Sequence, residues 1–551
     1  MYKYNITLTK VMNIENLLKQ KIIDAVNKIG LDVQEDDAVL EHPKDETRGD
    51  YATNIALQYC KKLNLKPRDF ALKIVEELDH KGIEKIEIAG PGFINFFLKS
   101  EILQSIVKDV ISKNDNYGRG LQKGKKINVE FVSANPTGDL HLGHARCAAI
   151  GDSICRLYDF AGYEITREFY VNDAGVQVEK MGASLRARYL NELGLEAKVP
   201  EDGYHGLDLV DIAKELVTKY GDKLIAENEQ NSKTFVQEGI HLELEKIKKD
   251  LTLFRVRFDV YSFESDVRKD RKVEKTLDEY KEFTYVDNGA TFLKTSDFLD
   301  DKDRPVVKSD GSYTYLMPDI TYHLQKLSHG YDLLVDVLGA DHHGYTNRMR
   351  SALMMKGYSA DIIDFELVQV VRLMKDDVEV KMSKRGGTTV TLRELAEEVG
   401  VDATRYFFVA RAATSHLDFD YDLALDQSSS NPVYYAQYAH ARLCKLLDTG
   451  ADIGIDMSAS KLNETAEINL LKHLQEFPNT IESCAKSREP YKVATYIQKL
   501  ASLTHAFYTE CRVIDRDNIS LSQSRLALVK ASQIVMRNAL NVLGVNAPQQ
   551  M

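Results

Sequence analysis

A strand-like segment, a turn and an amphipathic helix follow one another between residues 126 and 161. Residues 127–132 are apolar and β-branched, as is typical of a strand. Asn135, Pro136 and Gly138 then indicate a turn. The residues that follow repeat apolar side chains in steps of three and four, which predicts a helix with one apolar face. A strand followed by a helix in this way is the repeating unit of an open parallel α/β sheet.

The turn ends in the tetrad His141-Leu142-Gly143-His144, directly before the helix. Ligands bind at the carboxyl ends of strands in an open parallel sheet, and the free N–H groups of a helix N-terminus attract anions. The tetrad therefore predicts a phosphate site. The two histidines are alternatively zinc ligands or packed core residues. No paired-cysteine motif accompanies them, and the glycine and proline around them favour an exposed turn.

The length and composition of the chain limit its class. With 551 residues the chain is longer than one hydrophobic core supports, so we expect three or more domains. At 44% hydrophobic and 28% charged residues, it has the composition of an ordinary soluble protein. No apolar run reaches membrane-spanning length and the first residues lack a signal-peptide core, so we expect no membrane partner. The six cysteines show no paired pattern, which suits a reducing cytoplasm.

Four regions of the chain differ in their pattern. Residues 1–115 combine helical patterns with a strand–turn–strand signature, which predicts an α+β module. Residues 116–410 alternate strand and helix candidates, which predicts a doubly wound α/β domain. Within this domain, residues from about 177 to 295 are mostly charged helix, and we interpret them as an insertion with solvated faces. Residues 411–551 form helical patterns throughout.

Two further polar turns follow strand candidates in the α/β domain. The apolar run 331–338 suits a buried parallel strand and ends in the turn 339–344, GADHHG. A strand candidate at 365–373 leads to the basic loop 381–387, KMSKRGG. At one edge of the sheet, these turns and the tetrad would offer imidazoles, glycine backbone and mobile lysines, which suits a nucleoside triphosphate that loses pyrophosphate. Taken alone, KMSKRGG is better explained as a solvated lysine-rich loop.

HLGH followed far downstream by KMSKR resembles the two signature motifs of class I aminoacyl-tRNA synthetases. The resemblance extends to the arginyl-tRNA synthetase family through blocks spread over practically the whole chain. These blocks are 130–144 (EFVSANPTGDLHLGH), 170–175 (YVNDAG), 310–319 (DGSYTYLMPD), 339–345 (GADHHGY) and 431–442 (NPVYYAQYAHAR), with RLALVKASQIVMRNALNVLGVNAP near the C-terminus. One such motif is a weak signal, whereas this many in order are specific.

The resemblance implies a Rossmann-type catalytic domain, an N-terminal α+β module that contacts the outer corner of the tRNA, and an all-α anticodon-binding domain. It implies that arginine, ATP and tRNA(Arg) react through arginyl-adenylate to give arginyl-tRNA, AMP and pyrophosphate. It also implies that arginine activation waits for bound tRNA. Mg²⁺ would accompany ATP, and we assign no metal ligand in the protein. We expect a cytoplasmic monomer.

The same resemblance assigns residues to each substrate. The catalytic residues would be His141, His144, Lys381 and Lys384, with Lys384 stabilising the pyrophosphate leaving group. The residues expected to bind ATP are His141, Gly143, His144, Gly339, Asp341, Met382, Ser383 and Lys384. The residues expected to bind arginine are Glu130, Ser133, Asn135, His144, Tyr315, Asp319 and His342.

The chemistry of arginine is compatible with these assignments. A guanidinium is a planar fork of five donors, which suits the carboxylates of Asp319 and Glu130, with Tyr315 as an aromatic wall. A lysine substrate would leave part of this acceptor set unpaired, so we expect no editing domain. Each residue also has a structural alternative: Glu130 as an edge-strand surface charge, Asp319 as a helix N-cap and Tyr315 as core packing. His342 stands where some family members carry glutamine, which makes its role the least defined.

The resemblance also suggests residues that contact tRNA. The net charge of −12 does not exclude an RNA partner, because a local basic face can still bind phosphates. Splayed bases of single-stranded RNA stack on aromatic side chains, so Tyr435, Tyr438 and Arg442 are candidates in the helical domain. Tyr51 and Asn54 are candidates in the N-terminal module. For all five, packing or capping within the protein is an open alternative.

Two other functions compete with this interpretation. The first is another nucleotidyltransferase with the same signatures, which the N-terminal module and the helical C-terminal third disfavour. The second is a tRNA-binding paralogue without catalytic activity. The presence of His141, His144, Lys381 and Lys384 argues against it.

Overall fold

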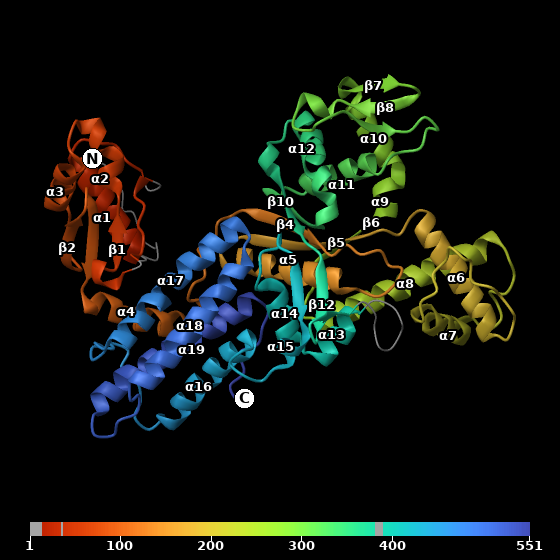
Figure 1. Cartoon of the computed structure of the whole chain (residues 1–551). Helices are drawn as coiled ribbons and strands as arrows, with labels where there is room; N and C mark the ends of the chain where they lie inside the picture. The colour runs from red at the N-terminus through yellow and green to blue at the C-terminus, as the bar shows by residue number, and fades with distance from the viewer. Residues whose placement is uncertain (1–13, 35–36, 44, 381–389) are drawn as a thin grey trace, which may run out of the picture.

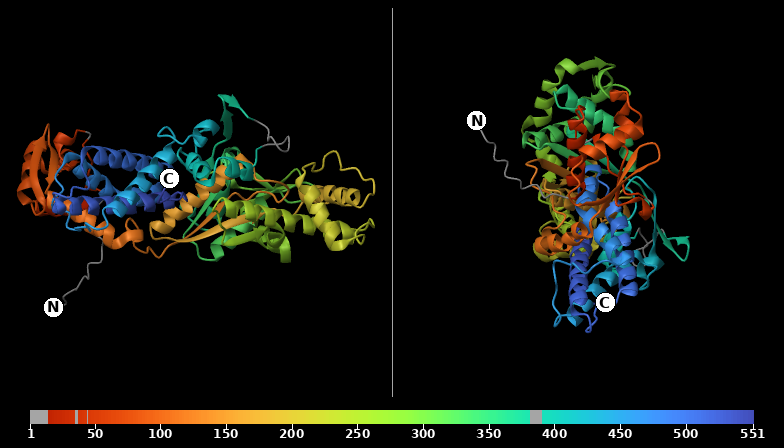
Figure 2. Two further views of the ribbon diagram at one scale, coloured as in Figure 1. Left: turned by 90° about the horizontal axis from the view of Figure 1, so that it is seen from below. Right: turned by 90° about the vertical axis from the view of Figure 1, so that its left-hand side faces the viewer.

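The computed structural model describes residues 14–34, 37–43, 45–380 and 390–551 (Figure 1). The molecule is elongated, with the N-terminal module at one end and a helical projection from the α/β domain at the other (Figure 2). A parallel sheet lies between them, and a bundle of long helices extends from it beside the N-terminal module. Among the described residues, no helix combines the length and apolarity that crossing a bilayer requires.

The N-terminal module is a small antiparallel sheet covered by helices, as its sequence predicts. Its strands lie in the order β1-β3-β2, and the expected hairpin joins the last two. Its elements are α1 (Ile14–Lys28), β1 (Tyr51–Thr53), α2 (Ile55–Tyr59), α3 (Pro67–Glu77), β2 (Ile83–Ala89) and β3 (Phe93–Leu98). Gly92 in the hairpin turn approaches the backbone of Pro67 so closely that a Cβ would lie 2.9 Å from it. Helix α4 (Ser100–Lys113) leads from this module to the rest of the chain.

The central sheet has five parallel strands in the order β11-β10-β4-β5-β6. Numbered by their sequence within this sheet, the strands read 5-4-1-2-3, which is the doubly wound Rossmann arrangement. They are β4 (Lys126–Phe131), β5 (Glu164–Val171), β6 (Val260–Phe263), β10 (Leu333–Gly339) and β11 (Ile363–Val368). Helices α5 (Leu142–Phe160), α11 (Leu316–Ser328) and α12 (Thr346–Met355) lie in the connections between these strands. The predicted α/β fold is confirmed.

The segment interpreted as a charged helical insertion is more varied than its sequence suggests. Helices α6 (Val176–Glu192), α7 (Asp208–Tyr220) and α8 (Glu229–Leu253) form the projection seen in Figure 1. The chain then returns to the sheet as edge strand β6, inside the predicted insertion. After α9 (Glu264–Arg268) and α10 (Lys272–Glu279), strands β7 (Thr284–Asp287), β8 (Ala290–Leu293) and β9 (Arg304–Val307) form a separate antiparallel sheet. Strands β6 to β9 have four residues each, too short to give a clear alternating pattern.

The C-terminal region is mainly helical. A small sheet of β12 (Val371–Lys375), β13 (Val378–Glu379) and β14 (Leu417–Asp420) precedes it, together with α13 (Leu392–Glu398), α14 (Val401–Val409) and α15 (Tyr421–Leu425). The long helices are α16 (Pro432–Thr449), α17 (Thr465–Ser487), α18 (Pro490–Glu510) and α19 (Ile519–Val542). The fully buried Arg405 of α14 donates to Asp152 of α5 at 2.6 Å and to the carbonyl oxygen of Leu543, after α19, at 3.1 Å. It thereby connects the helical region to the Rossmann domain.

Candidate active site

Two of the predicted polar turns meet where the order of the central sheet reverses. Strands β4 and β10 are neighbours, with Glu130 opposite Asp336. The histidine tetrad follows β4, and the turn 339–345 follows β10, so both lie at the carboxyl edge of the sheet. This reversal is the point at which doubly wound sheets bind their ligands.

The two histidines of the tetrad form the N-terminal cap of α5. His141 Nδ1 accepts hydrogen bonds from the N–H groups of Gly143 and His144, at 3.0 and 3.4 Å. His144 Nδ1 in turn accepts from the N–H of His141 at 3.3 Å, and the two rings stack with centroids 3.7 Å apart. A Cβ on Gly143 would lie 2.9 Å from the His141 ring, so a larger residue here would displace that ring.

Both imidazoles are neutral near pH 7. Burial lowers the pKa of His141, and burial together with the neighbouring His141 lowers the pKa of His144 to about 4. Because each Nδ1 accepts a backbone hydrogen bond, we assign the proton of each neutral ring to Nε2. The tetrad therefore offers two Nε2–H donors beside a helix N-terminus, a combination that suits phosphate oxygens.

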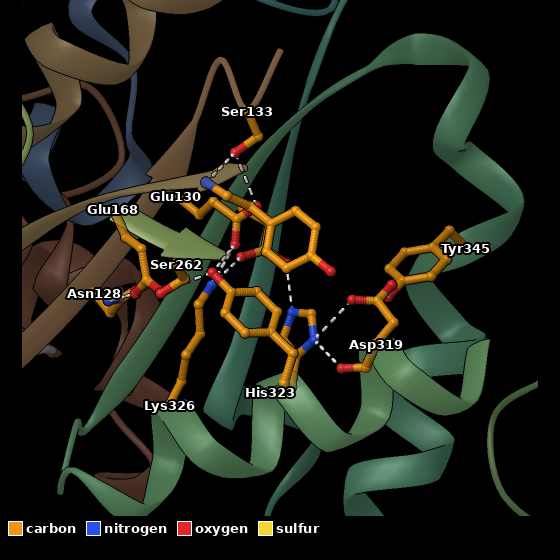
Figure 3. A network of polar contacts seen from close by, with 12 residues as sticks. Asn128, Glu130, Ser133, Glu168, Ser262, Asp319, His323, Lys326 and Tyr345 are labelled. Carbon is orange, nitrogen blue, oxygen red and sulfur yellow. Dashed lines mark hydrogen bonds and ion pairs between the residues drawn. The ribbon is translucent and has the colours of Figure 1, made fainter. Parts of the chain in front are cut away.

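Glu130 is enclosed in a network of polar contacts (Figure 3). Its Oε1 accepts from Ser133 Oγ at 3.0 Å, and its Oε2 accepts from Tyr322 Oη at 2.8 Å and Lys326 Nζ at 2.5 Å. Its residue is only 8% exposed on a central strand, so it is not an edge-strand surface charge. Ser133 and Val132 have positive φ angles of 40° and 69°, a strained backbone that directs Ser133 Oγ at Glu130.

A second part of the network lies on helix α11. His323 Nε2 is 2.9 Å from Asp336 Oδ2, and His323 Nδ1 is 2.8 Å from the carbonyl oxygen of Asp319. Since both ring nitrogens face acceptors, the ring is doubly protonated. Burial would lower the pKa of His323, but Asp336 and Asp319 raise it to about 10. Burial favours the neutral form of Asp336, but Lys326 and His323 together lower its pKa to about 2.

The network contains more carboxylates than cations. Glu168 accepts from Ser262 and Asn128, each at 2.6 Å. Its Oε1 also lies 2.8 Å from Tyr322 Oη, so Glu168 and Glu130 share the single proton of that hydroxyl. Asp319 accepts a short hydrogen bond from the Tyr345 hydroxyl. In the part of the chain that the structure describes, the cations Lys326 and His323 lie among the four carboxylates Glu130, Glu168, Asp319 and Asp336. Burial among these groups raises the pKa of Glu130 despite the opposing effect of Lys326. Such a site attracts a further cation.

The remaining predicted arginine residues surround this network less closely. Tyr315 precedes the first turn of α11 and is 86% exposed, so it is not core packing. It, rather than Asp319, occupies the N-cap position of α11. The exposed Asn135 donates to Gln177 of α6 at 2.7 Å. His342 lies 3.7 Å from Asp341 in the exposed turn after Gly339.

The predicted lysine loop falls outside the described residues. This concerns Lys381, Met382, Ser383 and Lys384. The chain is described again from residue 390, where Thr391 forms an antiparallel bridge with His141. The next residue, Leu392, donates its N–H to the carbonyl of Leu140 at 2.7 Å.

The residues predicted to contact tRNA differ in accessibility. Tyr51 is 3% exposed and its hydroxyl accepts from Gln475 of α17 at 2.7 Å, so its ring is not available to an external partner and the prediction does not fit it. Asn54 is half-buried at the N-cap position of α2. Tyr435 and Tyr438 both contact the His505 ring, and their ring centroids lie 4.7 and 6.1 Å from its centroid, respectively.

Arg442 and Tyr508 extend this aromatic face. The Arg442 guanidinium lies over the Tyr508 ring, 3.4 Å from its centroid. Tyr438 and Tyr508 are 41% and 38% exposed, so their rings are open to solvent. The surface formed by α16 and α18 therefore combines accessible aromatic rings with an arginine.

A pocket of about 230 Å³ opens beside the network, along the C-terminal half of α11. Its walls include Glu168, Tyr322 and Lys326 together with strand β6. None of the residues predicted from the sequence lines it, and Asp319 lies in the first turn of α11. We therefore distinguish this pocket from the predicted arginine site.

Sequence reasoning missed the cations that hold the carboxylates. Asp319, His323 and Lys326 follow one another at steps of four and three, which places them on one face of α11. Asp336 interrupts the apolar run of β10, an unusual position for a carboxylate. Both signals were visible in the sequence, but only the fold shows that these side chains meet.

Three sequence families match successive parts of the chain. They are the arginyl tRNA synthetase N terminal domain (residues 16–98), the class I (R) tRNA synthetase catalytic domain (106–416) and the DALR anticodon binding domain (436–551). The domain boundaries predicted at 115/116 and 410/411 are not tested by these matches and stay predictions.

Relatives match nearly the whole chain. Arginine–tRNA ligase of Shouchella clausii is 50% identical over 523 residues, which cover 93% of this chain and 94% of that protein. Arginine–tRNA ligase of Bacillus subtilis is 47% identical over 550 residues, covering 98% and 99%. The fold is similar to that of Thermus thermophilus arginyl-tRNA synthetase, with a TM-score of 0.76 at 21% identity, covering 98% of this chain and 100% of that one. With three domain matches in order and relatives about 50% identical over nearly their full length, the chain belongs to the class I arginyl-tRNA synthetase family.

Proposed function

We propose that this chain is an arginine–tRNA ligase. It activates arginine with ATP to arginyl-adenylate and transfers the arginyl group to tRNA(Arg), with release of AMP and pyrophosphate. The observation that carries the proposal is the carboxylate-rich network of α11, β4 and β10, next to a histidine turn at the point where the sheet order reverses. A cationic amino acid and a polyphosphate are the pair of ligands that this combination suits.

The histidine turn is proposed to bind ATP. The Nε2–H groups of His141 and His144 donate to phosphate oxygens while their Nδ1 atoms cap α5. The carboxylate of arginine attacks the α-phosphorus, and pyrophosphate leaves with the bonding electrons. Fixed donors stabilise the charge that develops on the phosphates in this step. Gly339 and Asp341 complete the site from the neighbouring turn, and Lys381, Met382, Ser383 and Lys384 are proposed to bind the phosphates, with Lys384 on the leaving group.

Asp319 is proposed to bind the guanidinium of arginine. Its carboxylate is only partly buried, and Tyr345 and His323 hold it from two sides. Glu130 and Ser133 form the inner wall, Tyr315 covers the side chain, and Asn135 and His342 contact the α-amino and carboxylate end. A planar guanidinium presents five donors in a fixed fork that can bind a carboxylate through two parallel hydrogen bonds, whereas an ammonium offers three donors on a single nitrogen.

The other proposed properties concern partners and location. We propose that Mg²⁺ enters as the complex of ATP, and we assign no metal ligand in the protein. The accessible rings of α16 and α18 suit the stacked bases of a tRNA anticodon loop. We propose that Asn54 of the N-terminal module also contacts the tRNA, and that the enzyme is a cytoplasmic monomer.

A charging assay tests the proposed function. Purified protein, ATP, total tRNA and each of the twenty labelled amino acids are incubated in parallel, and label on tRNA is counted. Arginine alone should be transferred. Transfer of a different amino acid would identify another ligase, and no transfer by protein that binds tRNA would identify a paralogue without catalytic activity. A pyrophosphate-exchange assay without tRNA should be nearly silent, because we propose that arginine activation requires bound tRNA.

A further inference from the structure

Helix α8 connects the projecting α6–α8 unit to the sheet (Figures 1 and 2). At its sheet end, Glu243, Lys246 and Asp250 are spaced by three and four residues, so they share one face of the helix. Two of them form ion pairs with residues outside the insertion. These two ion pairs connect α8 to the two segments that lie beside the histidine turn, residues 141–144.

The first ion pair reaches the turn directly. Lys246 Nζ lies 2.6 Å from Asp139 Oδ1, and Asp139 is two residues before His141. Lys246 also faces Asp208 of α7 at 3.8 Å and Glu243 at 4.0 Å. Burial raises the pKa of Glu243 to about 8, so this carboxyl is mainly neutral near pH 7. Asp139 is therefore the nearest charged partner of Lys246.

The second ion pair reaches the turn through another segment. Asp250, whose side chain is 3% exposed, accepts a short hydrogen bond from Arg393. Arg393 is two residues beyond Thr391, which forms the antiparallel bridge with His141. Arg393 thus holds the segment that lies against the backbone of residues 140 and 141.

We propose that Lys246 and Asp250 are positioning residues for the histidine turn. Helix α8 fixes the chain before His141 through Asp139, and the segment beside His141 through Arg393. The imidazoles of His141 and His144 are thereby held at the angle at which their Nε2–H groups face ATP. This inference rests on the proposed function, and it makes the α6–α8 unit a part of ATP binding rather than a solvated insertion.

Charge variants test the proposal in the full-length protein. We expect Lys246→Met and Asp250→Asn each to raise the KM for ATP by about tenfold while the KM for arginine stays unchanged, because a small displacement of a positioned group weakens its contact with the substrate. Lys219→Met is the matched control: Lys219 pairs with Glu238 between α7 and α8 at 2.8 Å, away from the turn. The double variant Asp250→Arg with Arg393→Asp should recover most of the activity that Arg393→Asp loses.

Hydrogen–deuterium exchange provides a readout that needs no activity. Residues 139–146 should exchange faster in both single variants than in the wild type, and at the wild-type rate in the Lys219→Met control. The proposal would be overturned if Lys246→Met and Asp250→Asn kept the wild-type KM for ATP and the wild-type exchange rate of residues 139–146. It would also be overturned if Lys219→Met changed both quantities to the same extent, or if the double variant recovered no activity. If the wild type fails to charge arginine but the exchange results hold, the proposed function is wrong and the positioning role stands.

Discussion

At the scale of single residues, His141 has two roles, one structural and one in ligand binding, and each belongs to a different nitrogen of its ring. The Nδ1 of His141 caps a helix, while the opposite edge of its ring is free to donate to a ligand. Capping alone would be satisfied by a shorter polar side chain, since Asn, Asp and Ser are preferred at this position. A histidine here is therefore explained by its second nitrogen.

Replacing His141 with asparagine distinguishes the two roles. Asparagine keeps the cap, so thermal unfolding of His141→Asn should stay close to that of the wild type, whereas His141→Ala should lose about 1 kcal/mol of stability. Both variants lose the Nε2–H donor, so both should form aminoacyl-tRNA on the order of 10²-fold more slowly. Calorimetry and single-turnover charging measure these effects. An asparagine variant with full activity would reduce His141 to a structural cap.

The charge of His323 predicts a specific pH dependence of stability. An unfolded histidine has a pKa of about 6.5, whereas the pKa of His323 in the fold is raised to about 10. The folded state therefore binds the extra proton, and its stabilisation is fully present below pH 6.5 and lost as the pH rises towards 10. The stability difference between wild type and His323→Gln should shrink between pH 6.5 and 9.5. Urea unfolding at several pH values measures it, and a constant difference would contradict a charged ring.

The residues that were predicted and those that were missed differ in how local their signals are. HLGH and its strand could be recognised because turn, cap and helix are consecutive in the chain. The role of Lys326 could not be recognised from the sequence, because its partner Glu130 is 196 residues away along the chain. Tyr51 was assigned to tRNA for a similar reason: its burial depends on Gln475, 424 residues later. No local pattern indicates which surfaces a fold will cover.

At the scale of elements, the same limit applies to the strands. The residues 365–373 were interpreted as one strand, but the chain divides there into β11 and β12, which belong to different sheets. The long amphipathic helix α5 was recognisable because many of its residues repeat the same pattern. Short edge strands were not recognisable, because they form through hydrogen bonding to a neighbouring strand and their own composition gives little signal.

The aromatic face of α16 and α18 yields a prediction at this scale. Tyr438→Ala should weaken tRNA binding by about 1–3 kcal/mol if one base stacks on its ring. Tyr285→Ala is a matched control, because Tyr285 is 40% exposed and stacks on Phe292 in the separate sheet β7–β9. Filter binding with tRNA(Arg) measures both affinities. Equal affinity of the Tyr438 variant and the wild type would place the anticodon elsewhere.

At the scale of the whole molecule, the N-terminal module is fixed to the helical bundle rather than tethered loosely. Lys472 of α17 pairs with Asp50 at 2.6 Å, and Gln475 of the same helix donates to the buried Tyr51. Asn479, one turn further on, bonds to Glu15 of α1. Farther along the chain, the Tyr117 hydroxyl donates to the carbonyl of Leu474 at 2.9 Å. One face of α17 thus sets the distance between the two parts proposed to contact the tRNA.

A double-mutant cycle tests this docking. Gln475→Leu leaves the buried Tyr51 hydroxyl without its hydrogen-bond partner, and Tyr51→Phe leaves the buried Gln475 amide without its partner. Each change should therefore destabilise the protein by about 1–3 kcal/mol. Replacing both polar groups together leaves no unpaired atom, so the double variant should be less destabilised than the sum, with a coupling energy of about 0.5–3 kcal/mol. Calorimetry of the four proteins gives this energy. Each single variant should also let the N-terminal module unfold in a separate, earlier transition and should weaken tRNA binding, because the two contact regions lose their fixed spacing. Additive effects and one common transition in all four proteins would show that the hydrogen bond between Tyr51 and Gln475 does not hold the module in place.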